Sequence, residues 1–132
     1  MTRSPPDNVA TVRAFVEAYN REDLDAALRL TTDTFELDFS RARGPYRGIY
    51  ARVQVRDVLA GMNSTFESVR FEPHEFIEAG GRVVMPMTIR FRGRDGIEVK
   101  AETTNLFEFR DGAVERIVLY QYIGEALKAA GV

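Results

Sequence analysis

Apolar residues recur every three or four positions in three segments of the first half of the chain. This spacing places them on one face of an amphipathic helix. Within residues 4–23 the recurring positions are Val12, Phe15, Val16 and Tyr19. A shorter stripe follows at Leu24, Ala27 and Leu28, and a third runs through residues 50–66 at Val55, Val58, Leu59, Met62 and Phe66. We therefore expect three helices in the first half of the chain.

A strand pattern lies between the second and third of these stripes. Phe35, Leu37 and Phe39 alternate with polar residues, among them Asp38, before the chain enters a basic, glycine-bearing loop. A shift of one residue would turn all three apolar side chains outward, so the alternation favours Phe39 facing the core and Asp38 facing away. A bulge near the end of the strand would reverse that orientation, and both orientations stay open at this point.

From Ser68 onward the apolar pattern has a period of two. It predicts four strands, in residues 69–72, 82–92, 97–109 and 114–122. Three pairs typical of tight turns lie between these runs: Gly80–Gly81, Asp95–Gly96 and Asp111–Gly112. The strands are therefore expected to form an antiparallel meander, with Pro73 and Pro86 at an edge or a bulge because proline has no N–H to donate. Residues 123–132 are expected to form a short terminal helix.

Helices followed by a long antiparallel sheet indicate an α+β fold, in one domain that spans residues 1–132. A strongly curved sheet wrapped over the helices would leave a mostly apolar cavity between the two layers. The expected lining consists of Phe15, Tyr19, Phe39, Met62, Phe66, Met85, Met87, Ile89, Phe91, Phe107 and Leu119, with Asn105 and Gln121 as polar exceptions. An unpaired buried amide costs about 1–3 kcal/mol. Each of the two amides therefore needs either a structural partner or a ligand.

Composition and charge exclude several classes of function. The chain of 132 residues has a net charge of −2, whereas a nucleic-acid-binding surface needs a basic excess. It has no cysteine and one histidine, which argues against disulfide, thiolate and zinc chemistry. The N-terminus has no apolar run typical of a signal peptide, and no stretch reaches the roughly 20 apolar residues that span a bilayer. We expect a cytoplasmic protein without a metal, a cofactor or a membrane partner.

Four segments carry a family resemblance. They are VRAFVEAYNREDLDAALRL at 12–30, GPYRG at 44–48, DGAVERIVLYQY at 111–122 and EALKAAG at 125–131. In this order, with a strand after the first and a meander before the third, the chain resembles the SnoaL-like branch of the nuclear transport factor 2-like superfamily. The resemblance implies a cone-shaped α+β barrel, with N-terminal helices packed in a strongly curved antiparallel sheet, often as a homodimer. Members include polyketide cyclases, a ketosteroid isomerase, epoxide hydrolases, dehydratases and proteins without known catalysis, so the fold alone does not decide the reaction.

The isomerase offers the most detailed comparison for the site. Its chemistry needs a carboxylate base and two oxyanion donors, a Tyr hydroxyl and a protonated Asp. By resemblance, Phe15 stands at the Tyr and Asn105 at the Asp, while the base falls at Phe39, or at Asp38 after a slip of one residue. Phe15 offers no donor, whereas Asn105 can donate through its amide. Asp38 is the candidate catalytic residue, because burial in the cavity would raise its pKa and suit it to acid–base work.

Two hypotheses of function follow. The first is an enzyme of the isomerase, cyclase or hydrolase type that acts on a small, largely apolar carbonyl compound. The second is a non-catalytic domain that binds a ligand or a protein partner. The first needs an ionisable group in the cavity, and the second does not. Arg41, Arg43 and Arg47 around Gly44 can either clamp a substrate carboxylate or form a solvated loop.

The last strand also carries an apolar stripe on the face away from the cavity. Val118, Tyr120 and Tyr122 form this stripe. On a monomer it would be an exposed apolar patch, and such patches mark interfaces, in which Tyr is enriched. We therefore expect a homodimer through the outer face of the sheet.

Overall fold

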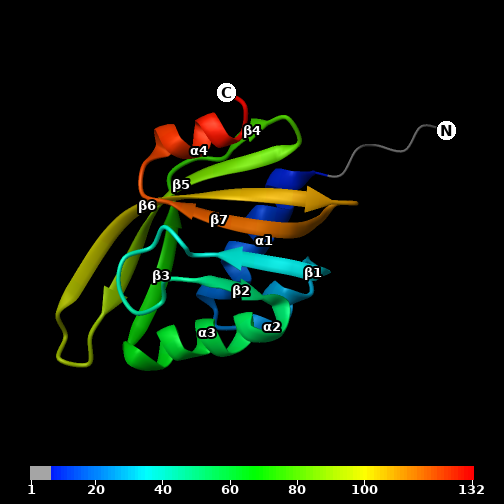
Figure 1. The fold of residues 1–132 in the computed structure, drawn as a ribbon. Helices are drawn as coiled ribbons and strands as arrows, with labels where there is room; N and C mark the ends of the chain where they lie inside the picture. Colours follow the sequence, from blue (N-terminus) through cyan, green and yellow to red (C-terminus); the bar gives the residue numbers. More distant parts are fainter. Residues whose placement is uncertain (1–6) are drawn as a thin grey trace.

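The computed structural model describes residues 7–132, and these form four helices and seven strands (Figure 1). In chain order they are α1 (Asn8–Asn20), α2 (Leu24–Leu28), β1 (Thr31–Asp38), β2 (Ile49–Ala51), α3 (Arg52–Thr65), β3 (Ser68–Pro73), β4 (Ile77–Ala79), β5 (Arg82–Arg92), β6 (Glu98–Arg110), β7 (Ala113–Tyr120) and α4 (Ile123–Ala129). Residues 1–6, in the stretch that we expect not to be a signal peptide, lie outside the described residues.

Side chains just before α1 and α2 each accept a hydrogen bond from a backbone N–H of the first helical turn. The Asp7 carboxylate accepts a hydrogen bond from the backbone of Ala10 at the start of α1, and Asp23 does the same for α2, both at 3.0 Å. Apart from Ala18, the buried residues of α1, α2 and α3 all belong to the apolar stripes predicted for these helices. No helix in residues 7–132 is long and apolar enough to cross a membrane.

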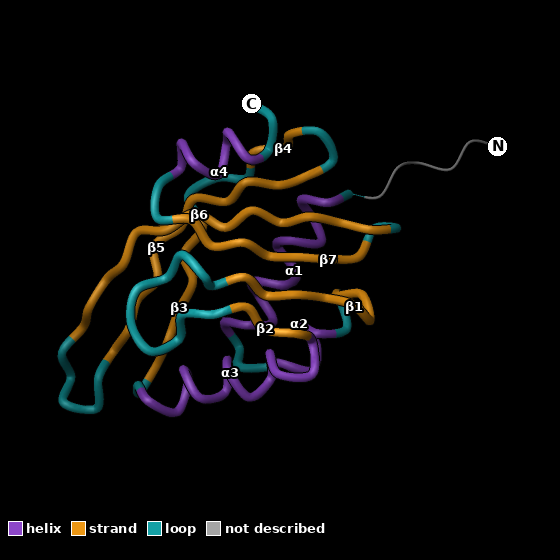
Figure 2. Tube along the Cα trace, in the orientation of Figure 1, coloured by secondary structure: helices purple, strands orange, loops and turns teal. Residues whose placement is uncertain are grey.

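The seven strands form one curled sheet with the order β2-β1-β7-β6-β5-β3, and β4 pairs separately with β5. Strands β3, β5, β6 and β7 pair antiparallel in chain order, which confirms the predicted meander. β1 pairs parallel with β7, so the sheet is mixed, a feature that the alternation along β1 alone did not predict. The sheet curls around α1 and α3 and makes the cone-shaped α+β fold (Figure 2).

The two strand prolines lie where the sheet tolerates them. Pro73 ends the edge strand β3. Pro86 lies inside β5, between the segment that pairs with β4 and the segment that pairs with β3. Its carbonyl accepts a hydrogen bond from His74 N at 2.8 Å, between these two segments. The nitrogen and the carbonyl of a strand residue point to the same side, so the proline nitrogen also lies in this gap, where no neighbouring strand needs a donor.

The outer face of the sheet carries a second, smaller core under α4. Val118 is 2% exposed there and Tyr120 9%. They are buried together with Val84, Leu106, one alanine of α4 and the alanine that caps its end. Tyr122 is exposed. The prediction that the whole stripe is open to solvent was therefore wrong, because the terminal helix covers it. The homodimer itself stays a prediction, which light scattering at micromolar concentration checks.

Candidate functional site

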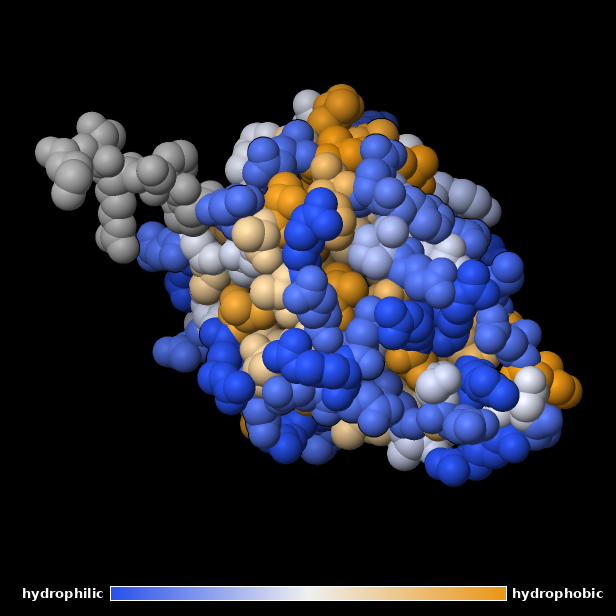
Figure 3. All heavy atoms as spheres, turned by 180° about the vertical axis from the view of Figure 1, so that it is seen from behind, coloured by the Kyte–Doolittle hydropathy of each residue, from blue (hydrophilic) through white to orange (hydrophobic). Residues whose placement is uncertain are grey.

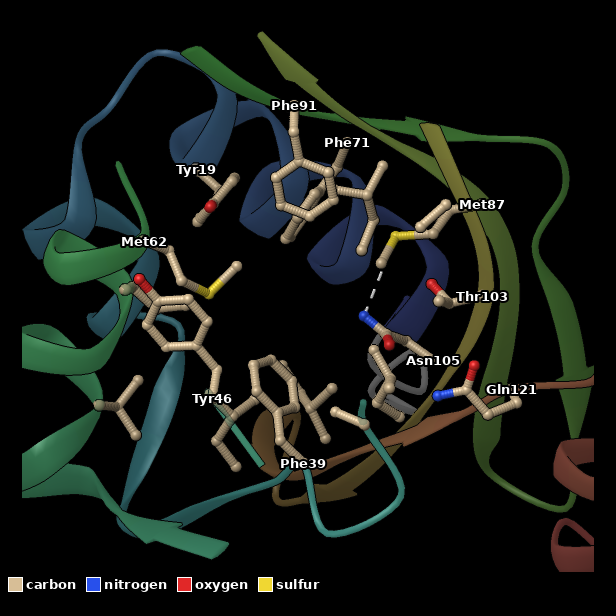
Figure 4. Close-up of a pocket in the computed structure, with 18 of the residues that line it drawn as sticks. Tyr19, Phe39, Tyr46, Met62, Phe71, Met87, Phe91, Thr103, Asn105 and Gln121 are labelled. Atoms are coloured by element: carbon tan, nitrogen blue, oxygen red, sulfur yellow. Dashed lines mark hydrogen bonds between the residues drawn. The ribbon is translucent and has the colours of Figure 1, made fainter. Parts of the chain in front are cut away.

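A cavity of about 410 Å³ lies between the concave face of the sheet and the helices α1 and α3. Aromatic, aliphatic and methionine side chains make most of its wall (Figure 4). In Figure 4, Phe71, Phe91 and Met87 surround it on one side, and Phe39 and Tyr46 on the other. A concave, largely apolar space of this size is typical of a small-molecule site.

Most of the predicted lining residues lie in this wall. They are Phe15, Tyr19, Phe39, Met62, Met87, Ile89, Phe91, Asn105, Leu119 and Gln121. Alternation explains the strand residues in this set, because every second side chain of a strand faces the concave side. The helical members belong to the buried faces of α1 and α3.

Three predicted lining residues do not reach the cavity. Met85 and Phe107 are buried in the core cluster that also holds α1, and Phe107 meets the ring of Phe15 edge-on, with ring centroids 6.0 Å apart. Phe66 caps the end of α3 and packs on Phe91 at 5.0 Å. The prediction was wrong for Met85 and Phe107 because alternation gives the face of a side chain but not its depth beneath the helices. It was wrong for Phe66 because this residue lies just past the last turn of α3, where the helical spacing no longer determines its direction.

The loop between β1 and β2 supplies a part of the wall that was not predicted. Its members are Ala42, Arg43 and Tyr46, and the Tyr46 hydroxyl lies 3.0 Å from Thr65 Oγ1 at the end of α3. A loop has no periodicity from which its inward side chains could be found. The apolar pattern could have predicted the other lining residues, because they lie on the faces expected to be buried. They are Phe35, Leu37, Val55, Leu59, Phe71, Ala101 and Ile117. Thr103 also had a signal, because it shares a strand face with Asn105.

The three arginines of this loop have different positions. Arg47 Nε donates to the carbonyl of Ser40 at 3.1 Å. The Arg41 guanidinium lies over the ring of Tyr120, 4.8 Å from its centroid. Arg43 lines the cavity. Thus the structure does not bring the three together as a clamp on one ligand, and only Arg43 remains in place for that role.

Asp38 lies on the opposite face of β1 from the cavity, as the alternation favoured. It is 2% exposed and is not part of the cavity wall. Its Oδ1 accepts a hydrogen bond from Ser40 N at 2.9 Å, and its Oδ2 accepts one from Arg116 Nη2 at 2.7 Å. Burial by itself raises the pKa of Asp38, but the hydrogen bonds from Ser40 and Arg116 and the arginine charge outweigh it and lower the pKa below its ordinary value. Asp38 is therefore ionised at neutral pH.

Several polar groups of the wall are already paired within the protein. The Tyr19 hydroxyl donates to Asn63 Oδ1 at 3.0 Å; burial, followed by the nearby Glu22 charge, raises its pKa, so it stays neutral. Gln121 Nε2 donates to the carbonyl of Arg41 at 2.8 Å, so this amide has the structural partner that was one of its two expected outcomes. The Glu102 carboxylate accepts from Thr88 on the outer face of the sheet. Residues 7–132 contain no cluster of three or more His, Asp or Glu side chains that could hold a metal ion.

Two polar atoms of the wall stand apart from these paired groups. Asn105 Oδ1 and Thr103 Oγ1 are buried and have no hydrogen-bond partner among the described residues. Asn105 is 5% exposed, and its Nδ2 contacts Met87 Sδ at 4.0 Å. Both residues face the cavity from β6 (Figure 4). Of the two predicted polar exceptions, Asn105 is thus the one that a ligand would complete.

We expect the ligand-free protein to become more stable when Asn105 is replaced by leucine. The variant removes a buried carbonyl without a partner, which should raise the free energy of unfolding by about 1–2 kcal/mol and Tm by roughly 3–6 °C. Calorimetry measures this shift. Asn63→Leu is the matched control, because it removes an amide that accepts from Tyr19 and should lower Tm. A lower Tm for Asn105→Leu would mean that the Asn105 amide is satisfied.

The sequence of the chain matches the model of one protein family. The sequence model of the SnoaL-like domain matches residues 12–118. The chain belongs to the SnoaL-like family. None of the curated proteins compared with the chain matches it in sequence.

Several solved structures have a fold similar to that of this SnoaL-like chain. An NTF2-like protein of unknown function from Burkholderia pseudomallei is similar, with 23% identity, 95% of this chain and 98% of that chain covered, and a TM-score of 0.77. A putative polyketide cyclase from Xanthomonas campestris has 24% identity, coverage of 93% and 96%, and a TM-score of 0.68. TerC, co-crystallised with polyporic acid, has 19% identity, coverage of 95% and 98%, and a TM-score of 0.76. At these identities the likeness establishes the cone-shaped α+β fold.

Proposed function

We propose that this SnoaL-like protein binds a small, largely apolar molecule in the cavity between the sheet and the helices. The observation that carries the proposal is the apolar wall around about 410 Å³, interrupted by the unpaired oxygens of Thr103 and Asn105. Ligand sites combine an apolar wall with a few polar groups that fix orientation. Methionines at two points of the wall, Met62 and Met87, suit a pocket that adapts its shape to the ligand.

A catalytic version of the proposal is an isomerase, cyclase or hydrolase type of reaction on a small apolar carbonyl compound. The similar structures support it to the extent that one is a putative polyketide cyclase and another was crystallised with polyporic acid. Both versions place the ligand in the same cavity. Only the catalytic version needs an ionisable side chain that transfers a proton to or from the ligand.

The geometry of the carboxylates favours binding without catalysis over the catalytic version. Glu102 is the one carboxylate among the lining residues, and it bonds to Thr88 on the outer face. Asp38 as a base remains a proposal that requires its side chain to leave Arg116 and cross to the other face of β1. Because both carboxylates are engaged away from the ligand space, the binding version is the better supported of the two.

A thermal-shift screen of steroids, polyketide aromatics and terpenoids tests the binding proposal. A ligand that binds only the folded protein raises Tm, by an amount that grows with its concentration over Kd. At least one compound should raise Tm, and each such compound is then incubated with the protein and examined for chemical conversion. No stabilisation by any of these ring-sized compounds at their solubility limits would contradict the proposal.

We expect the native protein to be a poor steroid isomerase. Phe15 lines the cavity in place of the expected tyrosine donor, and loss of one oxyanion donor typically costs about 10²–10³ in rate. Phe15→Tyr combined with Phe39→Asp puts a donor and a carboxylate on side chains that face the cavity, so the pair should raise activity on a 3-keto-Δ5 steroid above the native level. Absorbance of the conjugated product is followed for the native protein, both single variants and the pair. Robust native turnover would contradict this expectation, and Asp38→Asn would then test Asp38 as the base.

A further inference from the structure

The unpaired oxygens of Thr103 and Asn105 lie two residues apart on the concave face of β6. Residues at this separation on a strand have Cα atoms about 6.5–7 Å apart, and their side chains point the same way. A buried polar atom without a partner costs about 1–3 kcal/mol. Two such atoms next to each other in a cavity therefore favour a ligand that supplies the missing bonds.

The contact of Asn105 with Met87 orients the amide. Nδ2 points to Met87 Sδ at 4.0 Å, which leaves Oδ1 as the unpaired end (Figure 4). A carbonyl oxygen can only accept a hydrogen bond, whereas the Thr103 hydroxyl can donate or accept. The pair therefore presents one obligatory acceptor beside one group that can serve as a donor.

Resting on the proposed binding function, we propose that the ligand carries a hydroxyl group, as an alcohol, a phenol or an enol, between these two side chains. The ligand O–H donates to Asn105 Oδ1, and the ligand oxygen accepts from the Thr103 hydroxyl. Each of these O–H···O bonds spans about 2.7–2.8 Å, so one ligand oxygen serves both side chains when their oxygens lie within about 5.5 Å of each other. A ketone or an ether oxygen can accept from Thr103 but leaves Asn105 Oδ1 without a donor. Consequently, the site selects the enol form of a carbonyl compound over its keto form.

The other residues of the cavity wall indicate what the rest of such a ligand is. Phe39, Phe71 and Phe91 lie around the cavity with Met62 and Met87, so the body that carries the hydroxyl is an apolar ring system. Aromatic rings pack against such a wall by stacking or by edge-to-face contact. The inferred class is a hydroxylated aromatic or enolised cyclic compound rather than a plain hydrocarbon or a fully etherified one.

Three probes of nearly the same shape test this inference: 2-naphthol, 2-methoxynaphthalene and naphthalene. Their Kd values are measured by titration calorimetry, with Thr103→Val and Asn105→Leu beside the native protein. We expect 2-naphthol to bind the native protein about ten-fold more tightly than the other two. Each variant should reduce this preference several-fold, without weakening the binding of naphthalene.

Two further variants serve as controls. Thr103→Ser keeps the hydroxyl and should keep the preference. Thr104 pairs with Tyr120 of the outer core, so Thr104→Val makes the same chemical change on the outer face of the same strand and should leave all three affinities as they are. Circular dichroism and Tm confirm that each variant is folded.

The possible results separate this inference from the proposal on which it rests. Equal affinity of the native protein for all three probes would overturn the hydroxyl inference and leave the binding proposal standing. A preference that survives both Thr103→Val and Asn105→Leu would also overturn it, because the hydroxyl would then be recognised elsewhere. Failure of all three probes to bind at their solubility limits would overturn the inference, and the binding proposal would fall with it if the thermal-shift screen also gave no stabilising compound.

Discussion

The Met87→Trp variant is expected to lose binding of ring-sized ligands, with an increase in Kd of at least about 100-fold. Met87 is 1% exposed, points into the cavity from the middle of β5 and touches the Asn105 amide. An indole at this position would occupy the space that the ligand needs and block access to Asn105. Titration with 2-naphthol, or with any compound that stabilises the native protein, measures the loss.

The stability of this variant gives an independent check on the cavity. Inserting a larger side chain into a well-packed core typically costs 1–3 kcal/mol. Here the ring enters about 410 Å³ of open space, so Met87→Trp should unfold within about 1 kcal/mol of the native protein. Met87→Leu is the matched control, because it conserves volume and should still bind the ligand. Ligand binding that survives in folded Met87→Trp would place the site elsewhere.

The fold could be predicted to a large extent because its elements carry strong periodicity. The helical stripe of Val12, Phe15, Val16 and Tyr19 is buried in α1, and the meander strands lie where the period of two predicted them. The parallel pairing of β1 with β7 was not predictable in the same way. Alternation determines which face of a strand is buried, but it contains no information about which strand lies beside it.

The outer face illustrates a second limit of the sequence pattern. Val118 and Tyr120 were correctly placed away from the cavity, and the terminal helix was expected as well. What the pattern could not show is that this helix folds back onto these two residues. An apolar stripe predicts that something covers it, and a later segment of the same chain serves as well as a second copy.

The candidate site was predictable in its strand residues and much less so in its polar details. Asn105 and Gln121 look alike in the sequence, as amides on apolar faces. The structure separates them, since Gln121 donates to a loop carbonyl while Asn105 keeps an unpaired oxygen. That difference depends on the path of the loop that carries Arg43 and Tyr46, and a loop path follows from tertiary packing rather than from local periodicity.

Removing the Asp38 carboxylate is expected to destabilise the fold by about 2–3 kcal/mol. Breaking a buried ion pair costs about 3–5 kcal/mol when it strands the partner's charge. Here Arg116 is 40% exposed at its side chain and keeps Glu36 at 3.4 Å, so its charge is only partly stranded and the expected loss of about 2–3 kcal/mol lies below that range. Asp38→Asn keeps the shape, but an amide cannot accept from both Ser40 and Arg116, and its NH₂ would face the guanidinium. Urea unfolding at pH 7 measures the loss, and Tm should fall by roughly 6–9 °C.

The matched control is Glu36→Gln, which removes a carboxylate from the same arginine. Glu36 is 43% exposed at its side chain, and exposed pairs contribute about 0–1 kcal/mol, so this variant should unfold close to the native protein. Equal destabilisation by Glu36→Gln and Asp38→Asn would mean that burial of Asp38 adds nothing to the ion pair.

The pH dependence of this effect follows from the lowered pKa of Asp38. A carboxyl group whose pKa is lower in the folded than in the unfolded protein stabilises the fold fully above its unfolded value, which is about 3.9 for Asp. This contribution disappears as the pH falls through the folded-state pKa, because the carboxylate is then protonated in both states. The difference in unfolding free energy between the native protein and Asp38→Asn should therefore be constant from pH 5 to 7 and shrink below about pH 4. A difference that instead grew with falling pH would show that burial dominates and that the pKa of Asp38 is raised, as a cavity acid would require.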